Sequence, residues 1–313
     1  MSLAFVFPGQ GAQSIGMGKD LAEAYPAAKA VFDEVDEALG EKLSDLIWNG
    51  DQAELTLTQN AQPALMATSL AAMRALEAEG VAVSAASYVA GHSLGEYSAL
   101  CAAGTFSVAD TARLLRRRGL AMQAAVPVGE GAMAAVLGLD IAAVRALAAE
   151  AAEGEVCAAA NDNDPAQVVV SGHKAAVERA AALAKERGAK RALLLPVSAP
   201  FHCELMEPAA REMEAALAEV SMSDPVVPVV ANVLAGPTSD ADDIRARLVE
   251  QVTASVRWRE SVAWMAGVGG VTSFWEIGAG KALSGMIRRI AKEAGTRAVG
   301  TSADVAGAAE ALG

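Results

Sequence analysis

Cysteine and histidine are scarce in this sequence. The 313 residues include three cysteines, Cys101, Cys157 and Cys203, and three histidines. Cysteines this few and this scattered cannot form a disulfide framework or a structural zinc site, so we expect reduced thiols. Because histidine is the most frequent general base in enzymes, a catalytic base has few candidates here.

Basic charge and long apolar stretches are also missing. Lys and Arg total 25 against 38 Asp and Glu, which gives a formal net charge of −13. This balance argues against general nucleic-acid binding, which needs a basic face to neutralise phosphates. No apolar run approaches the ~20 residues that span a bilayer, and residues 1–8 lack the basic start of a signal peptide. We therefore expect a cytoplasmic protein with no membrane or nucleic-acid partner.

The sequence does contain a regular alternation of strand-like and helical segments. Hydrophobic residues make up 53% and charged residues 20%, as in a globular protein with a large core. The strand-like runs of the outer parts of the chain are residues 3–7, 87–91, 226–231 and 272–277. The helical stretches are residues 107–125, 206–219, 242–252, one that starts at Pro63 and runs to about Glu79, and one that ends near Arg289. This alternation predicts an α/β fold with a mostly parallel sheet covered on both faces.

The middle of the chain has a different pattern. Its expected strands are residues 132–139, 155–160, 167–171 and 191–197, its helices are 141–152 and 174–187, and residues 161–165 form a turn. The order β-α-β-β-α-β is that of the ferredoxin-like split unit. We predict a catalytic core of residues 1–126 and 198–313, interrupted by a smaller ferredoxin-like subdomain of residues 127–197.

The segment Gly91-His92-Ser93-Leu94-Gly95 matches the nucleophile-elbow pattern G-x-S-x-G. It follows an expected strand and precedes an expected helix, which is the context that this motif requires. Such a tight turn exposes the serine oxygen at the positive end of the helix, where backbone N–H groups can bind an oxyanion. The sequence therefore predicts Ser93 as a nucleophile, with a purely structural turn as the alternative.

A serine nucleophile needs a base, and His202 is the best placed of the three histidines. His92 belongs to the turn itself, and its side chain should point away from Ser93. His173 starts a helix of the small subdomain, where an exposed capping role is expected. His202 lies where the chain re-enters the main body, near the expected cleft, although it could be a structural histidine. Its neighbour Cys203 fits a small buried apolar residue better than a second nucleophile.

Arg118 occupies an unusual place in the helix expected at residues 107–125. At about 100° per residue, Leu114, Ala121 and Ala125 form one apolar stripe, and Arg118 falls at its centre. A buried guanidinium needs a partner because an unpaired buried charge is very costly, and no carboxylate neighbours it on that helix face. A substrate carboxylate would fit the bidentate fork of the arginine. The alternative is a structural ion pair inside the protein.

Taken together, several motifs resemble those of the malonyl-CoA:acyl carrier protein transacylases. The matching segments are FPGQG at 7–11, QPA at 62–64, GHSLGEY at 91–97, RG at 118–119, QVVVSGH at 167–173, PFH at 200–202 and GAGK at 278–281. The resemblance covers nearly the whole chain. It implies an α/β-hydrolase-like core with a ferredoxin-like subdomain, in agreement with the pattern of strands and helices.

By position, the resemblance implies roles for particular residues. Ser93 would be the nucleophile and His202 the general base. The backbone amides of Gln10 and Leu94 would form the oxyanion hole, and the backbone carbonyl of Gln251 would orient the histidine in place of a third acid.

The resemblance also implies how the substrate is bound. Arg118 would bind the free carboxylate of the malonyl group, with Gln10 and Asn161 also near the substrate. Phe201 resembles the residue of malonyl-type rather than methylmalonyl-type relatives. Residues 253–256 read TASV and depart from the more usual Tyr-Asn-Pro-Val-like pattern, which concerns the shape of that loop.

The implied activity is transfer of a malonyl group from malonyl-CoA to the phosphopantetheine thiol of acyl carrier protein, through a malonyl ester of Ser93. It would supply extender units for fatty-acid synthesis and would need no metal or redox cofactor. Alternatives are an acyltransferase of a polyketide pathway, a serine thioesterase or other hydrolase, and a non-catalytic module that binds carrier protein. An ordinary α/β-hydrolase would place its histidine late in the chain, and no histidine follows His202.

The implied carrier protein is acidic, so an acidic enzyme would need a local basic patch to bind it. Two groups of basic residues are candidates, or else ordinary solvated charges: Lys185, Arg187, Lys190 and Arg191 in the small subdomain, and Arg288, Arg289 and Lys292 near the end of the chain.

Overall fold

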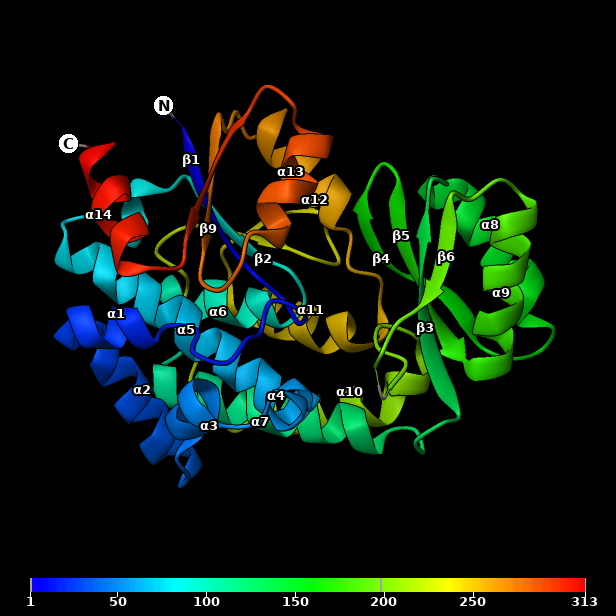
Figure 1. The fold of residues 1–313 in the computed structure, drawn as a ribbon, viewed down its shortest axis with the longest axis horizontal. Coiled ribbons are helices and arrows are strands. Elements are labelled where there is room, and N and C mark those ends of the chain that lie inside the picture. The colour runs from blue at the N-terminus through cyan, green and yellow to red at the C-terminus, as the bar shows by residue number, and fades with distance from the viewer. Residues whose placement is uncertain (1, 198, 313) are drawn as a thin grey trace.

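The computed structural model describes residues 2–197 and 199–312 and has two parts, each built on its own sheet. The larger part lies to the left in Figure 1 and contains both ends of the chain, and the smaller part lies to the right. Within the described residues, no helix is both long enough and apolar enough to cross a membrane.

The larger part is built on a six-stranded sheet with the order β10-β9-β1-β2-β7-β8. Its strands are β1 (Leu3–Phe7), β2 (Tyr88–Gly91), β7 (Val229–Ala231), β8 (Gly236–Thr238), β9 (Ser273–Ile277) and β10 (Gly295–Val299). All neighbouring pairs are parallel except β7 with β8. The carboxyl ends of β1 and β2 therefore lie at the same edge of the sheet, with Phe7 opposite Gly91.

Helices cover both faces of this sheet. They are α1 (Lys19–Ala24), α2 (Pro26–Leu39), α3 (Leu43–Asn49), α4 (Gln52–Thr56), α5 (Thr58–Ala78), α6 (Leu94–Ala102), α7 (Val108–Ala124), α10 (Glu207–Ala218), α11 (Ala241–Thr253), α12 (Trp258–Ala266), α13 (Ala282–Ile290) and α14 (Ser302–Glu310). The strand β1 shows why both faces must be covered, because it is buried along its whole length. Phe5 and Phe7 enter one hydrophobic cluster, whereas Ala4 and Val6 enter another on the opposite face.

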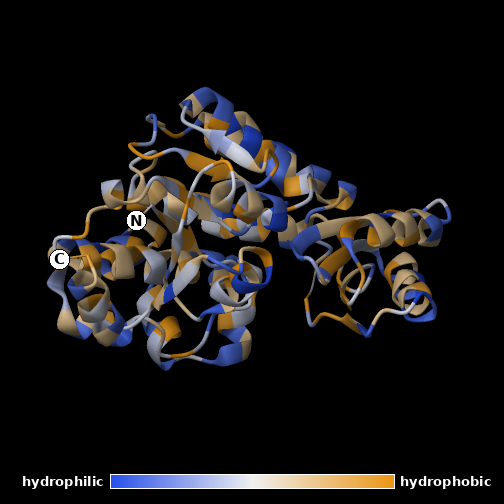
Figure 2. Cartoon of the chain, turned by 90° about the horizontal axis from the view of Figure 1, so that it is seen from above, coloured by the Kyte–Doolittle hydropathy of each residue, from blue (hydrophilic) through white to orange (hydrophobic). Residues whose placement is uncertain are grey.

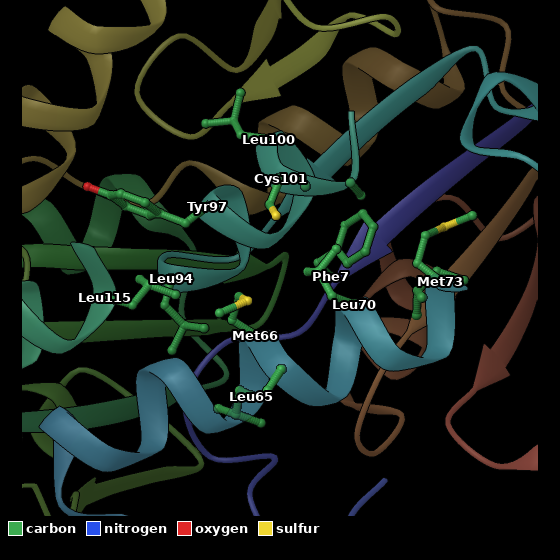
Figure 3. Packing of buried hydrophobic residues seen from close by; sticks show 14 of the residues in the cluster. Phe7, Leu65, Met66, Leu70, Met73, Leu94, Tyr97, Leu100, Cys101 and Leu115 are labelled. Carbon is green, nitrogen blue, oxygen red and sulfur yellow. The ribbon is translucent and has the colours of Figure 1, made fainter. Parts of the chain in front are cut away.

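The first of these clusters lies between the sheet and the long helices of the larger part. Leu70 and Met73 of α5 and Cys101 of α6 surround Phe7 in Figure 3. The surface helices carry both hydrophobic and hydrophilic residues, as Figure 2 shows, so each can bury one face and expose the other.

The smaller part is a four-stranded antiparallel sheet with the order β4-β5-β3-β6. Its elements are β3 (Gly131–Leu137), α8 (Ile141–Ala152), β4 (Cys157–Asp164), β5 (Gln167–His173), α9 (Lys174–Glu186) and β6 (Arg191–Leu194). Both helices pack on the sheet around a separate cluster that includes Val136, Leu147 and Val177. The expected α/β class and the β-α-β-β-α-β order are confirmed.

Pro63 does not start a helix, contrary to the sequence-based expectation. Helix α5 begins at Thr58, and Pro63 lies in its second turn. A proline there removes one backbone hydrogen bond, which packing can offset. Helix α7 crosses α5 very closely at this end: a Cβ on Gly119 would lie 2.5 Å from the Cα of Gln59. The turn of α5 that precedes Pro63 is therefore packed against α7.

The turn expected at residues 161–165 was also mostly wrong, because β4 continues through Asp164 and only Pro165 of that segment lies in the turn. Asn and Asp favour turns, since their side chains can bond the local backbone. Here the Asp162 carboxylate bonds a distant arginine, and the Asp164 carboxylate bonds both a distant arginine and the nearby N–H of Ala166. Arg259 Nε lies 3.0 Å from Asp162 Oδ1, and Arg289 Nε lies 2.7 Å from Asp164 Oδ2. The remaining differences are smaller: β8, β10, α12 and α14 were not anticipated, and several boundaries move by a few residues.

Candidate active site

The serine motif forms a tight turn between β2 and α6. Ser93 precedes the first helical residue with φ 54° and ψ −112°, a conformation that non-glycine residues rarely adopt. Neither flanking glycine has room for a side chain. A Cβ on Gly91 would lie 1.9 Å from the carbonyl carbon of Gly95, and one on Gly95 would lie 2.2 Å from the carbonyl oxygen of Phe7. The two glycines therefore allow the strand and helix to approach closely enough to form this turn.

Ser93 and His202 face one another across the site. Ser93 Oγ lies 2.7 Å from His202 Nε2, and His202 Nδ1 lies 2.9 Å from the backbone oxygen of Gln251. A carbonyl oxygen can only accept a hydrogen bond, so Nδ1 carries the ring proton and Nε2 can accept the hydroxyl proton. The arrangement is a serine–histidine pair whose ring is oriented by a backbone carbonyl.

The environment of His202 keeps its imidazole neutral. Its side chain is buried, and burial together with the nearby charge of Arg118 lowers its pKa to about 3. The hydrogen bond to the Gln251 carbonyl opposes this shift. At neutral pH the ring is therefore unprotonated and able to accept a proton.

A cavity of about 320 Å³ opens beside the pair, and its wall includes Gln10, Ser93, Leu94, Arg118, Asn161 and His202. Leu94 is the first residue of α6, so its N–H group has no acceptor within the helix. The loop that carries Gln10 runs tightly against the serine turn: a Cβ on Gly9 would lie 2.6 Å from the carbonyl oxygen of His92. The backbone of both residues thus borders the space next to Ser93.

Arg118 lines this cavity and is 1% exposed. Its Nη1 donates to Gln62 Oε1 at 2.7 Å, and its Nη2 donates to Gln251 Oε1 at 2.9 Å and to Ser93 Oγ at 3.3 Å. Its Nε has no hydrogen-bond partner, and the guanidinium lies over the ring of Tyr97. Among the ion pairs of residues 2–197 and 199–312, none includes Arg118.

The neighbouring arginines differ from Arg118 in this respect. Arg116 pairs with Glu41, and Arg117 pairs with Glu212 and Glu219. Arg118 is thus a buried cation whose direct partners are neutral oxygens and which borders a cavity. Such a group can accept an anionic ligand next to a nucleophilic hydroxyl.

Comparison with known proteins adds the family to this geometry. Residues 4–306 match the model of the acyl transferase domain family. The malonyl CoA-acyl carrier protein transacylase of Bacillus subtilis is 49% identical over 95% of this chain and 93% of its own length. That of Escherichia coli K12 is 49% identical over 92% of both chains. The chain belongs to the malonyl-CoA:acyl carrier protein transacylase family.

Solved transacylase structures share the whole fold. The acyl-carrier-protein-S-malonyltransferase of Bartonella henselae superposes with a TM-score of 0.97 at 55% identity, covering 100% of this chain and 99% of that one. A malonyl-transacylase solved in complex with a type II polyketide synthase acyl carrier protein gives a TM-score of 0.96 at 42% identity, covering 99% of this chain and 100% of that one. The two-part architecture is therefore that of the transacylase family.

The other residues singled out from the sequence lie both inside and outside the transacylase site. Asn161 and Phe201 line the cavity. His92 also borders it, but its Nε2 bonds Asn163 Oδ1 at 2.8 Å. His173 precedes α9 without capping it, because its Nδ1 accepts the N–H of Val156. Cys203 is buried, as expected for a small apolar residue.

The loop that departs from the usual family pattern is held by the smaller sheet. Val256 forms a parallel bridge with Asn161, through bonds from Val256 N to Ala160 O and from Asp162 N to Val256 O. This edge contact places Asn161 of the small sheet next to the segment that follows Gln251.

Sequence reasoning missed several polar residues that support the site. Gln62 Nε2 donates to Thr58 Oγ1 at 3.0 Å, and Thr58 Oγ1 donates to Gln10 Oε1 at 2.9 Å, so a chain of hydrogen bonds joins Arg118 to Gln10. Thr58 and Gln62 are four residues apart on a helix that is otherwise mostly apolar inside. That spacing of polar residues on a buried face was the available signal.

Asn232 and Glu96 were missed as well. Asn232 Oδ1 accepts the N–H of Ser93 at 2.8 Å, and its Nδ2 donates to the carbonyl oxygen of Gly91 at 2.7 Å. Two hydrogen bonds from one side chain thereby hold the strained turn in place. Nothing near Asn232 in the sequence indicates this contact, because 139 positions separate it from Ser93.

Proposed function

We propose that this protein transfers a malonyl group from malonyl-CoA to the phosphopantetheine thiol of an acyl carrier protein, through an ester of Ser93. Its relatives are malonyl CoA-acyl carrier protein transacylases over nearly their full length. The observation that carries the proposal is the position of Arg118, a buried guanidinium within hydrogen-bonding distance of Ser93 Oγ that has no ion-pair partner among the residues the structure describes.

In the first half-reaction, Ser93 Oγ attacks the thioester carbonyl of malonyl-CoA while its proton passes to His202 Nε2. The oxyanion of the tetrahedral intermediate is bound by the backbone N–H groups of Gln10 and Leu94. The carbon–sulfur bond then breaks, and the coenzyme A sulfur takes the proton from His202. The products are malonyl-Ser93 and free coenzyme A.

The second half-reaction follows the same steps in reverse with a different thiol. The phosphopantetheine thiol gives its proton to His202 Nε2 and attacks the carbonyl carbon of the malonyl ester. The bond to Ser93 Oγ breaks, and the serine oxygen recovers the proton. The transfer moves no electrons between redox states, and the serine–histidine pair supplies both nucleophile and base, so we propose that it needs no metal or redox cofactor.

Arg118 selects the acyl group in this scheme. The free carboxylate of the malonyl group displaces weaker contacts of the guanidinium and forms a charge-assisted bidentate pair. This contact holds the thioester carbonyl next to Ser93 Oγ. It also neutralises the positive charge that lowers the pKa of His202, so the histidine becomes a better base when malonyl-CoA is bound. Asn161 and the side chain of Gln10 complete the substrate-binding wall.

Fatty-acid synthesis is the proposed destination of the malonyl group. Polyketide synthesis is the second candidate, because one similar transacylase was solved with a polyketide synthase carrier protein. The proposed location is the cytoplasm, where the three free cysteines would stay reduced. For carrier binding, Lys190 and Arg191 are better candidates than Arg187 and Arg289, which already pair with Glu150 and Asp164.

Mass spectrometry of both proteins tests the proposed function. The enzyme is mixed with malonyl-CoA, acetyl-CoA or succinyl-CoA, quenched rapidly, and then mixed with carrier protein that bears phosphopantetheine. We expect a malonyl adduct on the peptide that contains Ser93 and its transfer to the carrier. Rapid thioester hydrolysis with no loaded carrier would favour a thioesterase, and carrier binding without any acyl transfer would favour a non-catalytic module.

A further inference from the structure

Glu96 is a buried carboxylate just behind the nucleophile turn, and the mechanism above gives it no role. It is 1% exposed and is the third residue of α6. Its Oε2 accepts the N–H of Asn232 at 3.0 Å and Gln251 Nε2 at 2.8 Å. Burial raises its pKa to about 7, while the hydrogen bonds from Asn232 and Gln251 and the charge of Arg118 lower it. Burying a carboxyl group destabilises the fold, so packing alone does not explain why Glu96 lies here.

The first contact of Glu96 fixes Gln251. A carboxylate accepts hydrogen bonds, so the NH₂ group of Gln251 must face Glu96 and its Oε1 must face Arg118, to which it is bonded at 2.9 Å. The backbone oxygen of Gln251 also accepts the bond from His202 Nδ1. The placement of this one residue therefore sets the position of the base and of the guanidinium together.

The second contact of Glu96 fixes Asn232. The backbone N–H of Asn232 is bonded to Glu96, and its side chain holds the N–H of Ser93 and the carbonyl oxygen of Gly91. Gln251 Nε2 adds a bond to the carbonyl oxygen of Ser93 at 3.1 Å. Both peptide groups of the strained serine are thus tied to partners that Glu96 holds.

We propose that Glu96 is a positioning residue that fixes Ser93, His202 and Arg118 relative to one another through Gln251 and Asn232. Glu96 itself does not touch the substrate. The acyl groups used to test this inference rest on the proposed function, whereas the hydrogen bonds that carry it do not.

The test compares Glu96→Ala and Glu96→Gln with a matched control. Glu276 is also a fully buried carboxylate near the start of a helix, where it accepts the N–H groups of Leu283 and Ser284 at 3.0 and 2.7 Å. It is not part of the cavity wall, so Glu276→Ala removes a comparable anchor away from the chemistry. For each variant, kcat and KM are measured with malonyl-CoA and acetyl-CoA, and the thermal midpoint is recorded.

We expect Glu96→Ala to lower kcat/KM for malonyl-CoA by about 100-fold, because small displacements of reacting groups are this costly. We expect kcat/KM for acetyl-CoA to fall only about tenfold, because acetyl transfer depends on His202 but not on Arg118. Glu96→Gln keeps the volume and one acceptor oxygen, and it recovers most of the loss. Glu276→Ala should lower the thermal midpoint without changing the ratio of kcat/KM for malonyl-CoA to kcat/KM for acetyl-CoA.

The inference would be overturned if Glu96→Ala folds and matches Glu276→Ala in kcat, in KM and in the malonyl-to-acetyl ratio of kcat/KM. If Glu96→Ala does not fold, Gln251→Ala cuts the same link and keeps the backbone carbonyl. An unchanged malonyl-to-acetyl ratio in Gln251→Ala would then overturn the inference. A wild-type enzyme that transfers no malonyl group would instead remove the proposed function.

Discussion

The two parts of the molecule handle buried charge in different ways. On the smaller sheet, the buried carboxylates of Asp162 and Asp164 pair directly with Arg259 of α12 and Arg289 of α13, which belong to the larger part. In the larger part, Arg118 is held by amide oxygens and has no ion-pair partner within the described residues. A carboxylate of the protein neutralises the arginine permanently. An amide oxygen is uncharged, so the positive charge of the arginine remains available to a ligand. The two aspartates of the smaller sheet therefore join the two parts, whereas the charge of Arg118 remains available to an anionic substrate.

The largest effect is expected in the turn of the larger part. Ser93→Ala removes the proposed nucleophile, and we expect malonyl transfer to fall by at least about 10³-fold. The matched control is Ser98→Ala, in the same helix, where the hydroxyl is buried without a hydrogen-bond partner. Stopped-time assays of carrier loading measure both. Equal activity of the two variants would contradict the assignment of Ser93.

The pH dependence sharpens the contrast between a histidine in each part. His202 must be neutral to accept a proton, so kcat/KM falls only as the pH drops through its pKa, which is about 3. We expect no acid limb from this residue above pH ~5. A limb near neutral pH can arise from Glu96, whose pKa is about 7, and should disappear in Glu96→Gln. His173→Gln, in the smaller part, should leave the profile unchanged.

The usual pKa of histidine is about 6.5. If kcat/KM is half-maximal near this pH, and remains so in Glu96→Gln, the low pKa of His202 is contradicted. Removing the nearby charge provides a second check, because Arg118 lowers the pKa of His202. In Arg118→Ala the pKa of His202 should therefore rise, and the acid limb should move to higher pH.

Asn232→Ala tests how the strained turn is held. The variant loses the bonds to the N–H of Ser93 and the carbonyl of Gly91, and we expect kcat to fall by about 10- to 100-fold. Asn163→Ala, on the smaller sheet, removes only the contact with His92 and should have a weaker effect. Kinetics of malonyl-Ser93 formation measure the difference. A smaller loss in Asn232→Ala than in Asn163→Ala would show that the turn does not depend on this clamp.

The smallest effects on activity are expected at the ion pairs formed by the acidic residues of the smaller part. The Asp162 carboxylate is fully buried, whereas the Arg259 side chain is 28% exposed. A double-mutant cycle with Asp162→Asn and Arg259→Met should give a coupling free energy of about 1–2 kcal/mol in urea unfolding. The surface pair Arg187–Glu150 should give less than about 1 kcal/mol. Similar values for the two pairs would remove the distinction between buried and surface charge here.

Local patterns in the sequence predicted much of this arrangement. The turn at residues 91–95 has the strand and helix that its motif requires, and the burial of Arg118 follows from helical spacing. Long-range partners could not be predicted. Asp162 and Arg259 are 97 positions apart, and Glu96 and Gln251 are 155 apart. The turn propensity of Asn and Asp therefore predicted a turn at residues 161–165. Residues 161–164 form a strand, in which Asp162 and Asp164 bond distant arginines.

The helix start at Pro63 failed for a related reason. The preference of proline for a first helical turn is a local rule, and α5 begins five residues before Pro63, where Gln59 packs closely against Gly119 of α7. The contacts of Asn232 and Glu96 were hidden in the same way, because each forms hydrogen bonds to residues that are remote in the sequence.

In the proposed reaction, Arg118 pairs with the free carboxylate of the acyl group. Competition between equal concentrations of malonyl-CoA and acetyl-CoA measures this directly, as the ratio of the two esters on the Ser93 peptide after a rapid quench. We expect wild type to carry almost only malonyl and Arg118→Ala to lose about 10²-fold or more in this preference. An unchanged ester ratio in a folded Arg118→Ala enzyme would contradict the account.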